Sequence, residues 1–406
     1  MKVIRRDFDF LSVAAISFIL YSSNCIIGKV WIPQSGFYAY YSDISPKTYL
    51  FIYFQLLIIW FYMSKARVVL GMIKPYQFIV QTTKCFRRAH NGSFFFWISL
   101  LFIAMIAICY VLFDVIGVAN YFSGLHKVEI QKQLPKFFGL TGWACLLCFF
   151  HFRNVRNRKM EIVSMVGILF FMVLGSRALF ATALVGALIS KSFDYIEKNQ
   201  ENNNRRIIIY GILIFLFLIL YKLIYEEVRA GNLIGVIDIL GNLSTWINLF
   251  DIAELRIVCA NYNYIIDHEW QLPVMDVVAR LSSVVPFANN YFQTVYPLRF
   301  SAILMEEIHT TYGLASNCWG EIYAMSGSII AVLVATAVWL TVIQYLNDRV
   351  RAGRSPFALA AVSYLSFYIH RLDWTEIIGC FKMVVLFFLV KLLFDITFGQ
   401  RRSSCT

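Results

Sequence analysis

Charged side chains are scarce in this sequence of 406 residues. Asp, Glu, Lys and Arg make up 15% of it, whereas a soluble domain uses about 25%. Hydrophobic residues make up 59%, and the mean hydropathy is +0.66. This balance excludes an ordinary water-soluble fold and indicates a membrane protein.

Closely spaced metal ligands are also missing. The nine cysteines are scattered, and Cys145 and Cys148 lie in an apolar stretch without a neighbouring His or acidic residue, so they predict neither a zinc site nor a redox motif. We expect no metal and no cofactor. Residues 1–30 have a basic start but no small-residue cleavage site, which predicts a retained first span and not a signal peptide.

Long apolar blocks follow one another along the chain. Each is close to the roughly 20 residues that cross a 30 Å hydrocarbon layer as a helix. They predict an all-α polytopic membrane protein with about ten transmembrane helices. The blocks lie at about residues 8–29, 48–64, 94–116, 137–152, 161–176, 178–195, 205–225, 318–345, 356–370 and 377–398.

The net charge of +12 comes from basic residues that form short clusters between the apolar blocks. A stripe along one face would suggest nucleic acid, so we expect no nucleic-acid partner. With ten spans, all clusters fall on one side, which the positive-inside rule assigns to the cytoplasm together with both chain termini. The clusters include Lys2, Arg5 and Arg6; Lys65, Arg67, Lys74, Lys84, Arg87 and Arg88; Arg153, Arg156, Arg158 and Lys159; Lys191, Lys198, Arg205 and Arg206; Arg349, Arg351 and Arg354; and Arg401 and Arg402.

The block from 161 to 195 has a length that suits one long helix or two short ones. Both of its flanks are basic, and only a hairpin keeps both in the cytoplasm. We therefore predict a turn near Gly175, Ser176 and Arg177, although each arm is then shorter than the usual 20 residues.

One outside connection is long and runs from about Glu226 to Asn317. It divides the chain into spans one to seven (1–225), a large periplasmic loop (226–317) and spans eight to ten (318–406). Helical periodicity at 234–239 and 274–281 predicts that the loop folds on the external surface. Its many aromatic residues suit either an interfacial aromatic belt or a surface that holds sugar rings.

Arg177 is the most informative single residue, because it interrupts an apolar hairpin. Charges within a membrane are costly and commonly functional, and a guanidinium can bind pyrophosphate through two parallel hydrogen bonds. The alternative is an arginine that reaches the external headgroups. The loop also uses Arg without Lys, and we expect Arg280 above all, with Arg256 and Arg299, to bind substrate pyrophosphate.

Acidic, imidazole and amide groups crowd the end of the loop. Glycosyl transfer needs a base for the attacking hydroxyl, and the candidate catalytic residues are His309 and Glu321, with Asn317 one turn before Glu321. The alternatives are a solvated loop histidine and an acid favoured by the helix dipole. Gly320, Ala324 and Gly327 predict close helix contact. The charged segment 370–376 is interpreted as an interfacial turn with an internal ion pair.

The Gly175-Ser176-Arg177 hairpin, the single large outer loop, and Gly320-Glu321-x-Tyr323 with Gly327 together resemble the Wzy-type polymerases of O-antigen and capsule synthesis. The resemblance covers nearly the whole chain in architecture and rests on short motifs. It implies a GT-C-like enzyme of the bacterial inner membrane that joins undecaprenyl-pyrophosphate-linked oligosaccharides at the periplasmic face. It also implies functional outer-loop arginines, and a chain-length regulator and a flippase as partners. The residues around His309 do not clearly fit the histidine of the related ligases.

Two other functions remain open from the sequence. An O-antigen ligase has a similar architecture and differs in its acceptor. A lipid-linked sugar flippase or transporter would commonly carry internal repeats and charges near the membrane midplane, whereas the sequence has no evident repeat and its candidate residues lie at one face.

Overall fold

The computed structural model describes residues 8–27, 44–71, 93–121, 133–135, 138–197, 204–242, 254–285, 299–308, 317–353 and 355–399. Within these ranges every regular element is a helix, so the predicted all-α class is confirmed. The first half contains α1 (Phe10–Ile27), α2 (Pro46–Gly71), α4 (Ser93–Tyr110), the π-helix η4 (Val111–Ile116), α5 (Val118–Tyr121), α7 (Phe138–Asn154), α8 (Arg158–Val173), α9 (Arg177–Glu197) and α10 (Asn204–Ala230).

The second half alternates short helices with long ones. The short helices are α11 (Leu233–Gly241), α13 (Glu254–Asp267), α14 (Val274–Ser282), α16 (Phe300–Ile308) and α17 (Cys318–Ser326). The long ones are α18 (Ile329–Gly353) and α20 (Trp374–Gly399), with α19 (Pro356–Tyr368) between them. The helices predicted at 234–239 and 274–281 are confirmed as α11 and α14.

Three helical stretches are long and apolar enough to cross a membrane: Phe94–Ile116, Ile329–Gly353 and Trp374–Phe398. Outward side chains on them are large and apolar, as at Phe102, Ile330 and Leu393, which suits contact with lipid. Shorter apolar helices occur at Phe10–Ser22, Ile209–Leu218 and Pro356–Tyr368. The chain is therefore an all-α membrane protein, while the number of about ten spans and the division at 225 and 317 stay predictions.

The predicted turn between residues 161 and 195 is confirmed. Helix α8 ends at Val173 and α9 begins at Arg177. Gly175 has a φ of 83°, a left-handed conformation that glycine adopts without the penalty of a side chain. The N–H of Ser176 bonds to the carbonyl of Phe171 at 2.9 Å, which closes the end of α8.

The apolar block at 318–345 is not one helix. It is divided into α17 and α18 by Gly327, whose φ is 63°. The predicted close contact is found at Gly320, where an added Cβ would lie 2.9 Å from Cδ1 of Ile265 in α13. Gly327 ends α17 instead of continuing the small-residue stripe.

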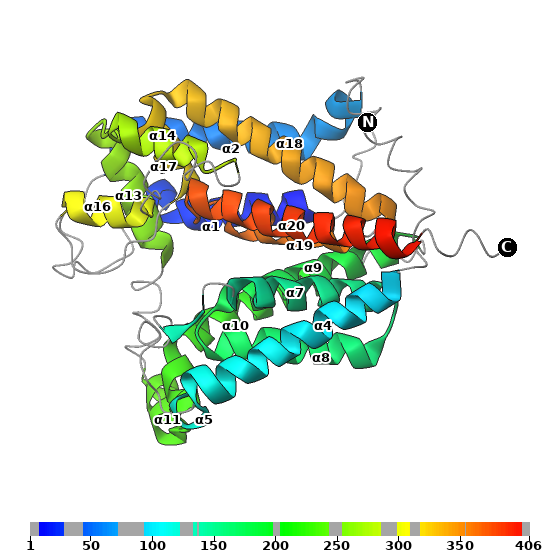
Figure 1. Ribbon diagram of the computed structural model, residues 1–406. Helices are drawn as coiled ribbons and strands as arrows, with labels where there is room; N and C mark the ends of the chain where they lie inside the picture. Colours follow the sequence, from blue (N-terminus) through cyan, green and yellow to red (C-terminus); the bar gives the residue numbers. More distant parts are fainter. Residues whose placement is uncertain are drawn as a thin grey trace.

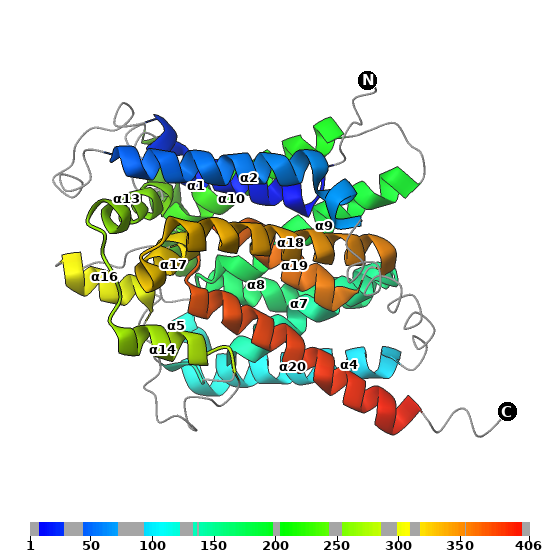
Figure 2. The same cartoon turned by 90° about the horizontal axis from the view of Figure 1, so that it is seen from above.

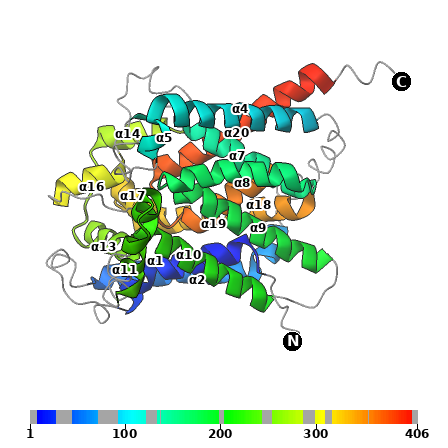
Figure 3. The same cartoon turned by 90° about the horizontal axis from the view of Figure 1, so that it is seen from below.

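The long helices run side by side and their connections separate into two ends (Figure 1; Figure 2). Helices α13, α14, α16 and α17 gather at one end, which we call the loop end. The α7–α8 and α18–α19 turns lie at the other, which we call the basic end because Arg156, Arg158 and Lys159 lie there. Figure 3 places α11, which follows α10, at the loop end as well. The start of α1 lies near the basic end, since the N–H of Phe10 bonds to Oδ1 of Asn347 late in α18.

Candidate functional site

A buried ion pair joins the loop to the helices that follow it. Nε of Arg280 in α14 lies 2.7 Å from Oε1 of Glu321 in α17, and both side chains are fully buried. Nη1 of Arg280 also donates to the carbonyl of Asp276 at 3.3 Å and lies 3.7 Å from its carboxylate. The other oxygen of Glu321 accepts the backbone N–H of Trp374 at the start of α20. One carboxylate thus connects α14, α17 and α20.

The electrostatics of Glu321 reflect this burial. Removal from solvent raises the pKa of its carboxyl, while the N–H of Trp374 and the guanidinium of Arg280 oppose that rise. Because the side chain has no exposed surface and both oxygens are bonded, Glu321 does not reach a substrate in this conformation. Its geometry fits a positioning residue better than the catalytic base that the sequence suggested.

His370 lies in the turn between α19 and α20 and is also buried. Its Nδ1 accepts a hydrogen bond from Nε1 of Trp319 at 3.0 Å. Its Nε2 lies 2.9 Å from the carbonyl oxygen of Ala14, and since a carbonyl only accepts, the ring proton is assigned to Nε2. Burial lowers the pKa of His370 to about 3, so the ring is neutral at physiological pH.

Asp373 connects the same turn to α16. Its Oδ2 accepts the N–H of Phe300, the first residue of α16, at 3.0 Å. Burial first, and then the nearby carboxyls of Glu321 and Glu376, raise the pKa of Asp373 well above its usual value. Arg299 is 75% exposed and its Nη2 lies 3.9 Å from Oε1 of Glu376. The turn therefore brings the carboxyls of Asp373, Glu321 and Glu376 close together, with Arg280 and Arg299 beside them.

The start of α17 is fixed by local bonds. Oδ1 of Asn317 accepts the N–H of Gly320 at 2.7 Å, which is the usual N-cap interaction. Cys318 donates from Sγ to the carbonyl of Ile369 at 3.2 Å. The N–H of Leu272 bonds to the carbonyl of Ala324 at 2.8 Å, so the chain entering α14 is attached to α17 before Arg280 is reached.

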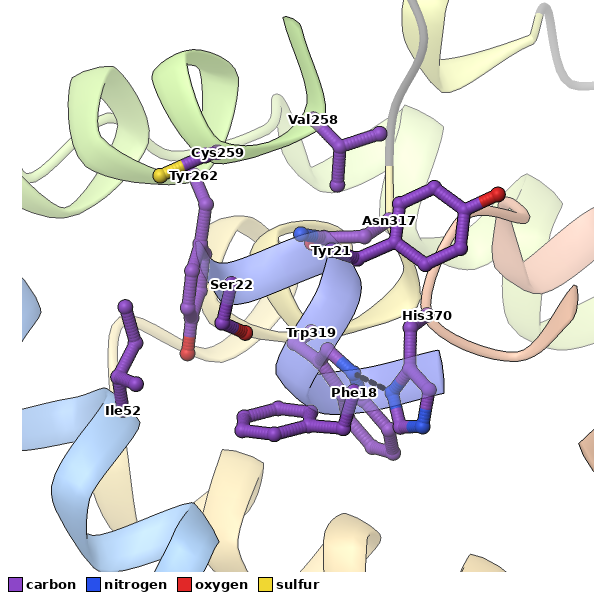
Figure 4. A pocket seen from close by; sticks show the side chains of 10 residues that line it. All are labelled: Phe18, Tyr21, Ser22, Ile52, Val258, Cys259, Tyr262, Asn317, Trp319 and His370. Atoms are coloured by element: carbon purple, nitrogen blue, oxygen red, sulfur yellow. Dashed lines mark hydrogen bonds between the residues drawn. The ribbon is translucent and has the colours of Figure 1, made fainter. Parts of the chain in front are cut away.

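A small cavity lies beside this network (Figure 4). Its free volume of about 10 Å³ is about the space one water molecule needs, which is too small for a sugar. Figure 4 shows the bonded rings of Trp319 and His370 on one side and Tyr262 of α13 on the other. The hydroxyl of Tyr262 donates to Oε1 of Gln55 in α2 at 3.0 Å, so this loop aromatic serves packing in the described structure.

The other expected site residues are distributed differently. Arg177 begins α9, is partly buried, and donates from Nη1 to the carbonyl of Leu218 in α10 at 3.0 Å. Arg256 belongs to α13, and its side chain lies outside the described residues. His309 lies outside the described residues altogether. Of the expected residues, the structure joins Arg280 and Glu321 directly.

Sequence reasoning missed the role of the 370–376 segment. The interfacial turn expected there is a turn, but His370 and Asp373 are buried and bond to Ala14, Trp319 and Phe300. The signal was present, since a His, an Asp, a Trp and a Glu fall within seven residues between two apolar blocks. It also missed that Cys259 is disulfide-bonded.

No protein-family model, no curated protein and no solved structure matches this chain.

Proposed function

We propose that this protein is a membrane glycosyltransferase that polymerises undecaprenyl-pyrophosphate-linked oligosaccharide units at the periplasmic face of a bacterial inner membrane. The observation that carries the proposal is the buried Arg280–Glu321 pair at the loop end. It anchors a loop rich in arginine to the helices that follow, at the end opposite the basic turns. In this proposal about ten helices cross the membrane in a GT-C-like arrangement, and both termini are cytoplasmic.

The disulfide at Cys259 supports the proposed orientation. Cys259 belongs to α13 at the loop end. Disulfides persist in oxidising compartments such as the periplasm and are rare in the cytosol. The basic end then faces the cytoplasm, which agrees with the positive-inside rule.

The proposed reaction needs a cation at the leaving group and a base at the acceptor. The bond between the anomeric carbon of the growing chain and its pyrophosphate breaks, and the acceptor hydroxyl forms the new glycosidic bond. Its proton passes to a base, for which His309 is the candidate, and the polyprenyl pyrophosphate leaves with the electron pair. Arg177, Arg256 and Arg299 are the proposed pyrophosphate contacts. Arg280, which the sequence placed first among these contacts, is buried against Glu321 and Asp276 and in this proposal positions α14 together with Glu321.

An apolar surface next to Arg280 fits the lipid part of such a substrate. Only Ala279 and Arg280 of α14 are buried. Val274 and Met275 are 76% and 70% exposed on the outward face, and Leu281 is exposed as well. An exposed apolar face of this kind is typical of a helix that contacts lipid. A polyprenyl chain on it would place its pyrophosphate at the loop end.

The direct test is chain extension by purified protein in detergent with a lipid-linked repeat unit. We expect a ladder of longer products. Arg177→Ala should lower the extension rate by about 100-fold, the effect of removing one donor from a developing anion. Arg177→Lys should restore only part of it, because an ammonium does not bind pyrophosphate through a planar fork.

Arg158→Ala is the matched control, since Arg158 begins α8 at the basic end as Arg177 begins α9. It should leave extension unchanged. Transfer to a lipid A core acceptor without a ladder would identify a ligase. Movement of the lipid-linked sugar without a new glycosidic bond would identify a transporter, and either result overturns the proposal.

A further inference from the structure

A groove opens at the basic end, far from the network at the loop end. It has a volume of about 380 Å³ and lies between α9 and α10 beside the last turn of α7. Its size falls within the range of small-molecule sites, which is about 300–1,000 Å³. The residues that line it are Leu184, Ala187, Leu188 and Lys191 from α9, Tyr210, Leu213 and Phe217 from α10, and Arg153 from α7.

The lining changes character along the groove. Leu184 and Lys191 are seven residues apart on α9, which is about 10 Å along a helix. Since α10 runs back from the basic end, Phe217 lies beside the Leu184 side and Tyr210 beside the Lys191 side. The groove is therefore apolar toward the middle of α9 and α10 and polar at the basic end.

The outer end carries an excess of positive charge. Nη1 of Arg153 lies 2.7 Å from Oε1 of Glu161, and Nη2 donates to the carbonyl of Ala187 at 3.5 Å. Lys191 is exposed at the same end. The neighbouring α7–α8 turn adds three exposed cations, and the described residues that line the groove include two basic side chains and no acidic one. These cations are Arg156, Arg158 and Lys159.

We propose that this groove binds one anionic phospholipid of the leaflet at the basic end. An acyl chain would lie against Leu184, Leu188 and Phe217, and the phosphate-bearing headgroup would lie at Lys191 and Arg153. Basic pockets between transmembrane helices on the cytoplasmic side are typical sites for anionic headgroups. Tyr210 suits the headgroup level, where aromatic residues with a polar tip are enriched.

The groove is open to the bilayer and not to the interior of the protein. Ile212 and Leu216, which flank the lining residues on α10, are 54% and 42% exposed. A lipid can therefore enter sideways from the membrane. The bound lipid would bridge α7, α9 and α10, and it is separate from the substrate lipid proposed for the loop end.

Native mass spectrometry of the full chain in detergent tests this, with phosphatidylglycerol and phosphatidylcholine as probes. The wild type should retain one phosphatidylglycerol about tenfold or more in preference to phosphatidylcholine, because two cations face the headgroup. Arg153→Gln with Lys191→Gln should abolish that preference. Leu188→Trp should fill the groove and release both lipids while the charges remain.

Lys191→Gln is also tested alone, because the side chain of Lys191 is exposed, whereas that of Arg153 is partly buried and its replacement disturbs the bonds to Glu161 and Ala187. It should lower the preference by several-fold. Arg349→Gln is the matched control, since Arg349 lies over the ring of Tyr345 in α18 at the same end, and it should change nothing. Equal retention of the two lipids by the wild type overturns the proposal. The proposal is also overturned if Leu188→Trp retains the lipids as the wild type does, or if inorganic phosphate displaces the bound phosphatidylglycerol. It is overturned as well if a second copy of the protein is found in place of the lipid.

Discussion

Nε of Arg280 lies 2.7 Å from Oε1 of Glu321, and neither side chain has any exposed surface. The pair links a loop helix to α17 across 41 residues of sequence. The only other fully buried side chain of α14 is that of Ala279, and Val277 is partly buried against the core, so the ion pair contributes strongly to the position of this helix. The stability of the loop end should therefore respond strongly to either partner.

Arg280→Met should destabilise the protein by about 3–5 kcal/mol, because it leaves the buried carboxylate of Glu321 without its cation. Glu321→Met alone should cost a similar amount. The double substitution Arg280→Met with Glu321→Met should recover much of the loss, since no unpaired charge then remains buried. Thermal unfolding in detergent measures all three.

The pair of Lys47 and Glu269 provides the control. Both side chains are more than half exposed, and exposed pairs contribute little to stability because solvent screens them. Lys47→Met should leave the unfolding temperature unchanged. If the double substitution at Arg280 and Glu321 cost the sum of the single ones, the pair would not act as a unit.

Local features were predictable from the sequence, whereas this pairing was not. Periodicity located α11 and α14, and charge on both flanks located the turn at Gly175. These signals depend on neighbouring residues. No local pattern indicates that Arg280 meets Glu321, or that His370 meets Ala14 across 356 residues.

The division of the predicted eighth span into α17 and α18 was likewise not predictable from local sequence. A glycine in an apolar block does not by itself end a helix, and Gly327 was expected to support helix contact. At the break the chain also lies close to a distant neighbour, since Nε2 of Gln271 is 2.5 Å from where a Cβ on Gly327 would stand. The sequence contains the glycine but not this contact.

Gly327→Ala should destabilise the protein by about 1–2 kcal/mol, the cost of the left-handed conformation for an L-residue. The displacement of Gln271 adds little to that cost, because the atom in the way is the end of a flexible side chain. Gly379→Ala is the control, because Gly379 is helical in α20 and has no atom within 4 Å of its added Cβ. Gly379→Ala should be neutral or slightly stabilising. The same result for Gly327→Ala would contradict the prediction that an L-residue is strained at position 327.

His370 should make stability fall as the pH is lowered. Its pKa is about 3 in the folded state, whereas the ordinary value of a histidine, which applies to the unfolded chain, is 6.5. Between these pH values the unfolded chain therefore binds one more proton than the folded protein. Stability then decreases by up to about 1.4 kcal/mol for each pH unit below about 6.5. His370→Gln, whose amide can still accept and donate, should lack this dependence. Unfolding temperatures from pH 7.5 to 4.5 measure the difference.

The raised pKa of Asp373 acts in the opposite direction. At pH values between the ordinary pKa of the carboxyl and its raised pKa in the folded state, the folded state binds more protons than the unfolded chain. The free energy of unfolding therefore falls as the pH rises through this range. For this reason the test of His370 is the difference between wild type and His370→Gln at each pH, which removes the part of the Asp373 contribution that the two proteins share. Parallel curves for the two proteins would mean that His370 does not titrate as its burial implies.

The disulfide at Cys259 predicts an unusual result when thiols are counted. A maleimide labels free thiols, so in denatured but unreduced protein it labels neither sulfur of the disulfide. Cys259→Ser removes one of these two cysteines and leaves the other as a free thiol that can be labelled. The labelled count should rise by one. Cys380→Ser, which removes a free thiol, should lower the count by one. A decrease in Cys259→Ser would show that the sulfur is reduced, and the loop end would then lose its evidence for an oxidising compartment.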